Sequence, residues 1–176
     1  MTLPVTLDDA KRQLRGEGIE QDAEISDFIL DAAGWVENYT SLILEAREVQ
    51  EQFRAAGRSV ELKAWPILPS ATAEVTYIDA SGIAVPVAGV RLDASKRPAR
   101  IYPASGTAWP TTNPGQVFTV TVRAGFEDPA DVPRVVRRAM LLLIGAYDDD
   151  REGGDTIAKA ETAARSLCRK LRRATL

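Results

Sequence analysis

The chain of 176 residues contains no histidine and a single cysteine, Cys168. The absence of histidine excludes His-based catalytic triads, most zinc and non-haem iron sites, and imidazole acid–base chemistry. One cysteine cannot form an internal disulfide framework or a multi-cysteine metal site. Arg169 and Lys170 follow Cys168 and favour a lowered thiol pKa, but no histidine can act as its base, so we expect a packed or exposed thiol. We therefore predict no catalytic residue, no cofactor and no metal, and expect the protein not to be an enzyme.

Long apolar runs are also missing, since no stretch approaches the roughly 20 residues that a membrane-spanning helix needs. Residues 1–5 lack the basic and apolar regions of a signal peptide, and we expect no membrane partner. The 22 basic and 25 acidic side chains leave a net charge of −3. No overall positive field therefore attracts the chain to nucleic acid.

Charge is unevenly distributed along the chain. Residues 1–40 carry nine acids and three bases, whereas residues 159–176 carry six bases and one acid. Unlike patches on neighbouring subunits would attract one another during assembly. Two solvated helix faces are the commoner explanation of such a pattern, because exposed ion pairs contribute little.

Two helices are expected in the first 40 residues. Thr6 can cap a short helix that runs to about residue 14, where Gly16 and Gly18 end it. A second helix is expected over residues 22–39, because its apolar residues recur at steps of three and four. These residues are Ile25, Phe28, Ile29, Ala32, Val36 and Tyr39.

Between residues 42 and 126 the pattern changes to short, β-branched runs separated by turn signals. Strands are expected over residues 42–53, 60–64, 74–79, 83–87, 90–92, 100–102 and 117–123, with a hairpin turn at residues 80–82. They predict an antiparallel sheet or small sandwich. The proline- and glycine-rich loop at residues 102–116 is expected to be exposed, with Trp109 as an interface hot spot.

Two more helices are expected after the strands. Pro133 suits the first position of a helix whose buried stripe is Val136, Ala139, Met140, Leu143 and Tyr147. The last helix, residues 156–171, has a thin stripe made mostly of alanine. We expect this helix to hold poorly to its own core and to need a partner.

Four carboxylates occupy five positions at residues 148–152. Oxygen ligands of this kind suit Ca²⁺ or Mg²⁺, but the spacing is not that of a calcium-binding loop, so a solvated helix end or subunit contact is favoured. The candidates for a subunit or tail interface are Trp109, Asp148, Asp149, Asp150 and Arg151.

Four stretches resemble a phage head–tail connector (adaptor) family, found in long-tailed phages and gene transfer agents. They are VTLDDAKRQLR at residues 5–15, DAEISDFILDAA with VENYT at residues 22–40, AGF with VP at residues 124–133, and the buried helix 140–147 followed by Asp150-Arg-Glu152. The chain departs from the family in its three aspartates before Arg151 and in its arginine-rich last helix.

The resemblance implies an α+β fold, in which a bundle of N- and C-terminal helices carries an inserted antiparallel β region. The expected parts are residues 1–41, the insertion 42–126, the buried helix 127–153 and a C-terminal basic helix 154–176. The resemblance also implies a ring, expected to be a dodecamer, beneath the capsid portal. That ring would extend the DNA channel without sequence-specific DNA binding and would join the head to a stopper or tail protein.

In this family's pattern the last helix docks on the portal protein. The resulting portal-binding candidates are Ile157, Ala160, Ala164, Arg165, Leu167, Cys168, Arg169, Leu171 and Arg172. The expected location is the head–tail interface of the virion, after assembly in the bacterial cytoplasm. The alternative is a small nucleic-acid-binding module that uses the same basic helix. A hydrolase is disfavoured because no base–nucleophile pair can be proposed.

Overall fold

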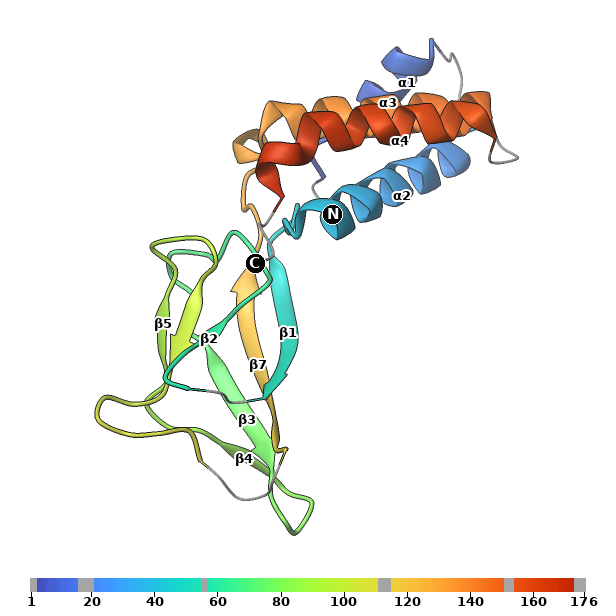
Figure 1. The fold of residues 1–176 in the computed structure, drawn as a ribbon. Helices are drawn as coiled ribbons and strands as arrows, with labels where there is room; N and C mark the ends of the chain where they lie inside the picture. The colour runs from blue at the N-terminus through green and yellow to red at the C-terminus, as the bar shows by residue number, and fades with distance from the viewer. Residues whose placement is uncertain (1–2, 16–20, 55–56, 111–114, 151–153, 173–176) are drawn as a thin grey trace. The chain divides into compact units, whose positions relative to one another are not determined.

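The computed structural model describes residues 3–15, 21–54, 57–110, 115–150 and 154–172. The chain divides into two compact units (Figure 1). A helical unit contains residues 1–45 and 126–176, and a β unit contains residues 46–125. The predicted α+β class is confirmed, with helices in one unit and antiparallel sheets in the other.

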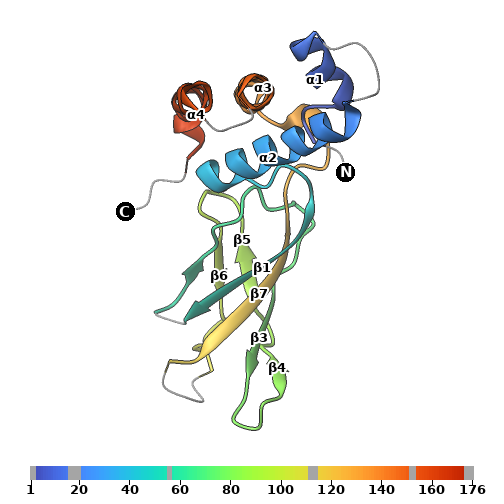
Figure 2. The ribbon, with the colours of Figure 1, turned by 90° about the vertical axis from the view of Figure 1, so that its right-hand side faces the viewer.

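The helical unit is built from segments at both ends of the chain. Its elements are α1 (Leu7–Leu14), α2 (Asp22–Thr40), the 3₁₀ turn η1 (Pro129–Asp131), α3 (Arg134–Asp149), α4 (Asp155–Cys168) and the 3₁₀ turn η2 (Arg169–Leu171). Helices α3 and α4 lie side by side and α2 packs against them, as Figures 1 and 2 show from two directions.

Helix α1 begins where local chemistry predicts it. The Thr6 side chain accepts a hydrogen bond from the Asp9 backbone N–H, and the Asp9 carboxylate accepts one from the Thr6 N–H, each at 3.2 Å. This capping box satisfies two N–H groups that the helix leaves unpaired. Asp9 also pairs with Arg12 at 2.5 Å and with Arg137 of α3 at 2.6 Å. The short helix is thus tied to α3.

The Asp9 carboxyl has a lowered pKa in this setting. Partial burial alone would raise that pKa, but the hydrogen bonds from Thr6 and the positive charges of Arg137 and Arg12 outweigh it. The hydrogen bonds and the two positive charges favour the ionised form of the Asp9 carboxyl.

The core of the helical unit lies between α2 and α3. Successive turns of α2 bury Ile25, Ile29, Ala32, Ala33, Val36 and Thr40. Helix α3 buries Val136, Ala139, Met140, Leu143, Ile144 and Ala146. The Phe28 and Tyr147 rings meet at the edge of this core, with centroids 6.1 Å apart. The predicted stripes of both helices are therefore confirmed at these buried positions.

Several sequence-based boundaries are wrong: the strand expected over residues 60–64 is only Val60–Glu61, the last α-helix ends at Cys168, and two other boundaries have a local cause. Pro133 does not occupy the first helical position, because its ψ of 131° is extended and α3 begins at Arg134. The strand expected from residue 42 begins only at Arg47. The N–H groups of Leu42 and Leu44 instead donate to the Thr40 hydroxyl and the Glu37 carboxylate, at 3.1 and 2.7 Å. These side-chain bonds replace a strand ladder at that point.

The β unit contains two antiparallel sheets. One has the order β1 (Arg47–Arg54), β7 (Val117–Ala124), β3 (Glu74–Ile78) and β4 (Ala84–Pro86). The other has the order β2 (Val60–Glu61), β6 (Arg100–Tyr102) and β5 (Arg91–Asp93). Strand β7 is central and alternates buried and less buried side chains, which matches its β-branched alternation in the sequence.

The hairpin between β3 and β4 forms at the predicted turn. Gly82 has φ of +80°, and the Asp79 N–H donates to the Ile83 carbonyl at 2.9 Å. The Asp79 carboxylate accepts hydrogen bonds from the N–H groups of Ser81 and Ile83 at 2.8 and 2.9 Å. An aspartate and a glycine thus close the turn by local bonding.

Candidate functional site

Helix α4 contains six of the nine predicted portal contacts. The other three follow its C-terminal end: Arg169 and Leu171 lie in η2, and Arg172 comes directly after it. Their exposure falls into three groups. Ala164 and Cys168 are buried, so they face the bundle and the prediction of surface contacts is wrong for these two. The half-buried residues are Ile157, Ala160, Leu167 and Leu171, and the exposed ones are Arg165, Arg169 and Arg172.

Aromatic residues of α2 hold α4 in place. The Trp35 and Tyr39 rings stack with centroids 5.4 Å apart. The Arg165 guanidinium lies over Trp35 at 5.8 Å and that of Arg172 over Tyr39 at 5.6 Å, while the Tyr39 hydroxyl donates to the Arg165 carbonyl at 3.3 Å. Cation–π contacts of this kind add to a thin alanine stripe. These contacts join α4 to α2 in addition to its apolar stripe.

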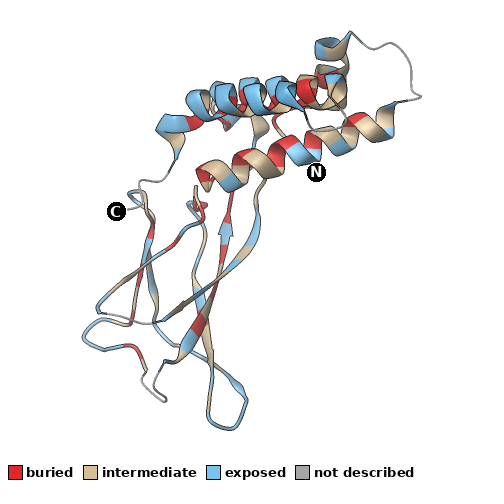
Figure 3. Ribbon diagram, turned by 45° about the vertical axis from the view of Figure 1, so that its right-hand side comes forward, coloured by how far each residue is buried: buried red, intermediate tan, exposed pale blue. Residues whose placement is uncertain are grey.

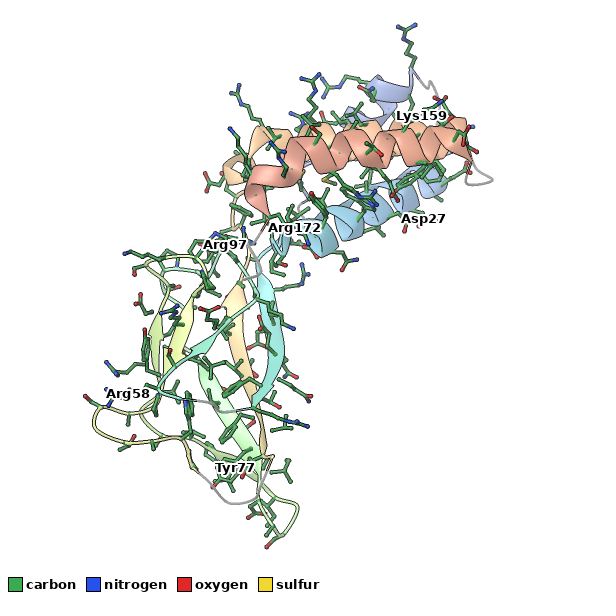
Figure 4. All side chains as sticks on the ribbon, in the orientation of Figure 1. Asp27, Arg58, Tyr77, Arg97, Lys159 and Arg172 are labelled. Atoms are coloured by element: carbon green, nitrogen blue, oxygen red, sulfur yellow. The ribbon has the colours of Figure 1, made fainter. Side chains whose placement is uncertain are left out.

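The outward side of α4 is basic. Lys159, Arg169 and Lys170 are exposed, and none has an ion pair with another residue that the structure describes. Arg165 differs, because it pairs with Glu161 at 2.7 Å. Figure 3 shows the exposed residues along this helix, and Figure 4 labels Lys159 and Arg172 on it and just after it. This surface can meet an acidic partner without first breaking internal ion pairs.

The Cys168 thiol is packed rather than activated. Its side chain is fully buried, and burial raises its pKa. The lowering expected from Arg169 and Lys170 is wrong, because the neighbouring bases are exposed while the thiol faces the bundle. A buried neutral thiol is a poor nucleophile.

The acidic residues at the C-terminal end of α3 have a structural role at one position, Asp150. The Asp150 carboxylate accepts a hydrogen bond from the Thr156 N–H at 3.3 Å. It therefore satisfies a free N–H group in the first turn of α4. Asp149 is exposed and Asp148 half-buried, while Arg151 and Glu152 lie outside the described residues. Within the described part of the chain no group of three potential metal ligands occurs.

Trp109 is a core residue of the β unit. Only 6% of it is exposed, and its ring lies 5.4 Å from Phe53 and 5.8 Å from Phe118. Phe118 also contacts Phe53 and Tyr77, at 5.3 and 5.7 Å. The expected exposed position of Trp109 is therefore wrong, because its section of the 102–116 loop folds back onto these rings.

The three-stranded sheet carries a charged face that sequence reasoning missed. Cross-strand pairs place Arg91 opposite Tyr102, and Asp93 and Glu61 opposite Arg100. Paired residues share one face of a sheet. Ile101 lies between Arg100 and Tyr102 on β6, and its side chain is fully buried on the opposite face of the same sheet. Arg100 and Glu61 pair at 2.8 Å, so part of the charge is neutralised internally.

Bases near this face line two hollows. One, with an internal volume of about 440 Å³, is lined by Arg58, Arg91 and Tyr102 among others. The second, of about 220 Å³, adjoins it at Tyr102 and includes Lys96 and Arg97. Figure 4 labels Arg58 and Arg97 on this unit. The density of bases over residues 91–100 is the sequence signal that could have revealed the surface.

Comparisons with known proteins bear on the fold. No protein-family model and no curated protein matches the chain. Chains of solved structures do match it, and three of them are described next. A chain from the neck of an empty GTA particle, computed with C6 symmetry, is 23% identical with a TM-score of 0.76, over 98% of this chain and 91% of that chain.

The second structure is the virion of a native gene transfer agent (GTA) particle. Its chain is 22% identical with a TM-score of 0.77, over 100% of this chain and 94% of that one. The third is the neck of a native GTA particle, computed with C12 symmetry, with 23% identity, a TM-score of 0.73 and coverage of 97% and 89%. This protein therefore shares its whole fold, both units included, with chains of GTA particles. Among the described helices none is long and apolar enough to cross a membrane.

Proposed function

We propose that the protein is a head–tail connector, an adaptor that forms a ring beneath a capsid portal. The ring extends the DNA channel and joins the head to a stopper or tail-completion protein. The observation that carries this proposal is the shared fold over 98% of this chain and 91% of a chain from a GTA neck. The motifs at residues 5–15, 22–40, 124–133 and 140–152 support the same family.

The neck structures were computed with C6 and C12 symmetry, which supports a ring for this chain as well. A closed ring requires a head-to-tail contact between unlike faces of one subunit. A protein of this kind works by binding and not by catalysis. Its place is the head–tail interface of the virion, following assembly in the bacterial cytoplasm.

Helix α4 and the residues just after it supply the proposed portal contact. Their exposed bases are Arg165, Arg169 and Arg172, and the same segment includes the half-buried Ile157 and Leu167. Apolar contacts framed by charges suit a protein interface. Residues 155–172 contain no aromatic side chain for stacking on nucleotides, and the nearby Trp35 and Tyr39 rings already contact Arg165 and Arg172. Asp148 and Asp149 are proposed for a neighbouring subunit or tail contact.

Mass in solution tests the proposal. Light scattering is measured for the chain alone and mixed with its cognate portal, and the expected result is a complex with a defined ring stoichiometry. The variant Arg169→Glu/Lys170→Glu reverses two exposed bases and is expected to lose portal binding. Lys96→Glu in the β unit is the matched control and is expected to bind as the wild type does. A wild-type chain that ignores the portal would overturn the adaptor assignment.

A nucleic-acid-binding module is the second candidate, and the exposed bases Lys159, Arg169 and Lys170 favour it. Binding of this kind falls steeply with salt, because each phosphate contact releases counterions. Mobility shift of duplex DNA at rising salt therefore separates the two candidates. Strong salt-dependent binding with no portal complex would favour the module, whereas an adaptor binds free DNA weakly at physiological salt.

A further inference from the structure

Helix α2 has an outward stripe opposite its buried face. The stripe contains Asp27, Leu30, Asp31, Gly34 and Asn38, each of which has another member three or four residues away, so that they share one side of the helix. Leu30 is 44% exposed. Both aspartates are exposed, and neither has a hydrogen bond or ion pair with another described residue. The stripe is therefore acidic and includes one exposed apolar residue; Figure 4 labels Asp27, its first member.

Helix α3 has an outward stripe of opposite charge. Arg134, Arg138, Leu142 and Gly145 lie along it, with Val135 at its edge. Val135 and Leu142 are 38% and 37% exposed. Neither arginine is paired within the described residues, unlike Arg137, which is held by Asp9. This stripe is basic and also partly apolar.

Each stripe contains a glycine, Gly34 or Gly145, that neither the backbone conformation nor the packing within one subunit requires. Gly34 and Gly145 lie inside helices, neither has a positive φ, and a Cβ added at either would meet no atom within 4 Å. Glycine destabilises a helix interior relative to alanine. Close packing of a helix from a second subunit against the backbone would explain why glycine occupies both positions.

The two stripes cannot meet within one chain. Helices α2 and α3 pack against each other through their buried faces, as the Phe28–Tyr147 contact shows. Their outward stripes therefore face away from one another. Unlike faces on two sides of one subunit are the requirement for a head-to-tail ring.

We infer that the outward face of α2 in one subunit docks on the outward face of α3 in the next. The occupant of each face is thus a second copy of this chain, and the inference rests on the proposed ring. Asp27 and Asp31 are one turn apart, and so are Arg134 and Arg138. The two aspartates can therefore pair with the two arginines in either a parallel or an antiparallel arrangement of the helices. Leu30, Val135 and Leu142 supply the apolar area beneath these pairs.

Charge reversal on one face at a time tests the contact. The acid-reversed variant is Asp27→Lys/Asp31→Lys, and the arginine-reversed variant is Arg134→Glu/Arg138→Glu. Light scattering is recorded over a range of concentrations, for the chain alone and on the portal. Each variant by itself sets like charges against each other and is expected to assemble only at concentrations at least about tenfold higher than the wild type.

An equal mixture of the two variants provides the decisive measurement. Every contact between unlike variants restores opposite charges, so the mixture is expected to form rings in which the two variants alternate. Arg91→Glu/Lys96→Glu reverses two exposed bases of the β unit and is expected to assemble like the wild type. Circular dichroism confirms that each variant is folded.

The outcomes separate this inference from the proposed function. A wild-type chain that forms no ring, alone or on the portal, overturns both. A ring that forms equally well from either reversed variant overturns only the assignment of the α2 and α3 faces. If the equal mixture assembles no better than either reversed variant alone, the proposed pairing of the α2 aspartates with the α3 arginines is overturned.

Discussion

Phe118 is the centre of the β unit, and replacing it offers the sharpest test of that unit's core. Its side chain is 1% exposed and touches three aromatic rings at centroid distances of 5.3 to 5.8 Å. Truncating a buried phenylalanine to alanine costs about 3–5 kcal/mol of unfolding free energy. The three ring contacts place Phe118→Ala in the upper half of that range, because aromatic pairs add to area burial.

Two further substitutions at this place separate packing volume from ring geometry. Phe118→Leu keeps most of the volume and is expected to cost less than about 1.5 kcal/mol. Val117→Ala changes the adjacent residue, which is 41% exposed, and is expected to stay within about 0.5 kcal/mol of the wild type.

Urea denaturation followed by tryptophan emission measures these differences. Trp109 contacts Phe118 directly, so its emission reports on the affected core. A loss below about 1 kcal/mol for Phe118→Ala would refute the described packing. So would equal losses for Phe118→Ala and Val117→Ala, since the two side chains differ in burial.

Three other predictions concern the helical unit. Because the pKa of Asp9 is lowered, its contribution to stability is complete above the ordinary carboxyl pKa of 3.8 and is lost as pH falls below that value. Asp9→Asn is expected to lower the free energy of unfolding at pH 7 by about 0.3–1 kcal/mol, measured by urea denaturation from pH 2 to 7. Asp150→Ala removes the acceptor of the Thr156 N–H and is expected to cost about 0.5–2 kcal/mol, measured in the same way. The Cys168 thiol is expected to react with a thiol reagent at least about tenfold more slowly in the folded than in the unfolded chain, followed by absorbance.

For each of these three predictions, a control variant or a result that would contradict it can be stated. A wild type and an Asp9→Asn variant that lose stability in parallel as pH falls would show that Asp9 does not carry the effect. Asp149→Ala is the control for Asp150→Ala, because Asp149 is exposed and its loss is expected to be within about 0.5 kcal/mol. Labelling of Cys168 at equal rates with and without denaturant would contradict its burial.

Several elements could be predicted from the sequence because short-range chemistry decides them. Thr6 and Asp9 form a capping box within four residues. Asp79 and Gly82 close a hairpin by bonds between near neighbours. The stripe along α2 follows from the helical repeat, which brings residues three and four apart onto one face. For these elements the chain contains both partners of each interaction within one turn or one hairpin.

Contacts between residues far apart in the sequence could not be predicted from it. Trp109 was expected on the surface of a loop, but its partners Phe53 and Phe118 belong to two different strands. The support of α4 comes from Trp35 and Tyr39, more than 100 residues earlier. A composition or a periodicity contains no information about such pairs, since neither says which surfaces meet.

The candidate surfaces divide in the same way. By itself the sequence determined the fold class, the helical and strand periods, and the separation of acidic and basic segments. Only the tertiary structure decided which of those charges face outward unpaired. Arg137 and Arg138 are adjacent, yet the first is held by Asp9 and the second lies on the open face of α3. The reason is physical, because the energy of a charge depends on its neighbours in space, and folding sets those neighbours.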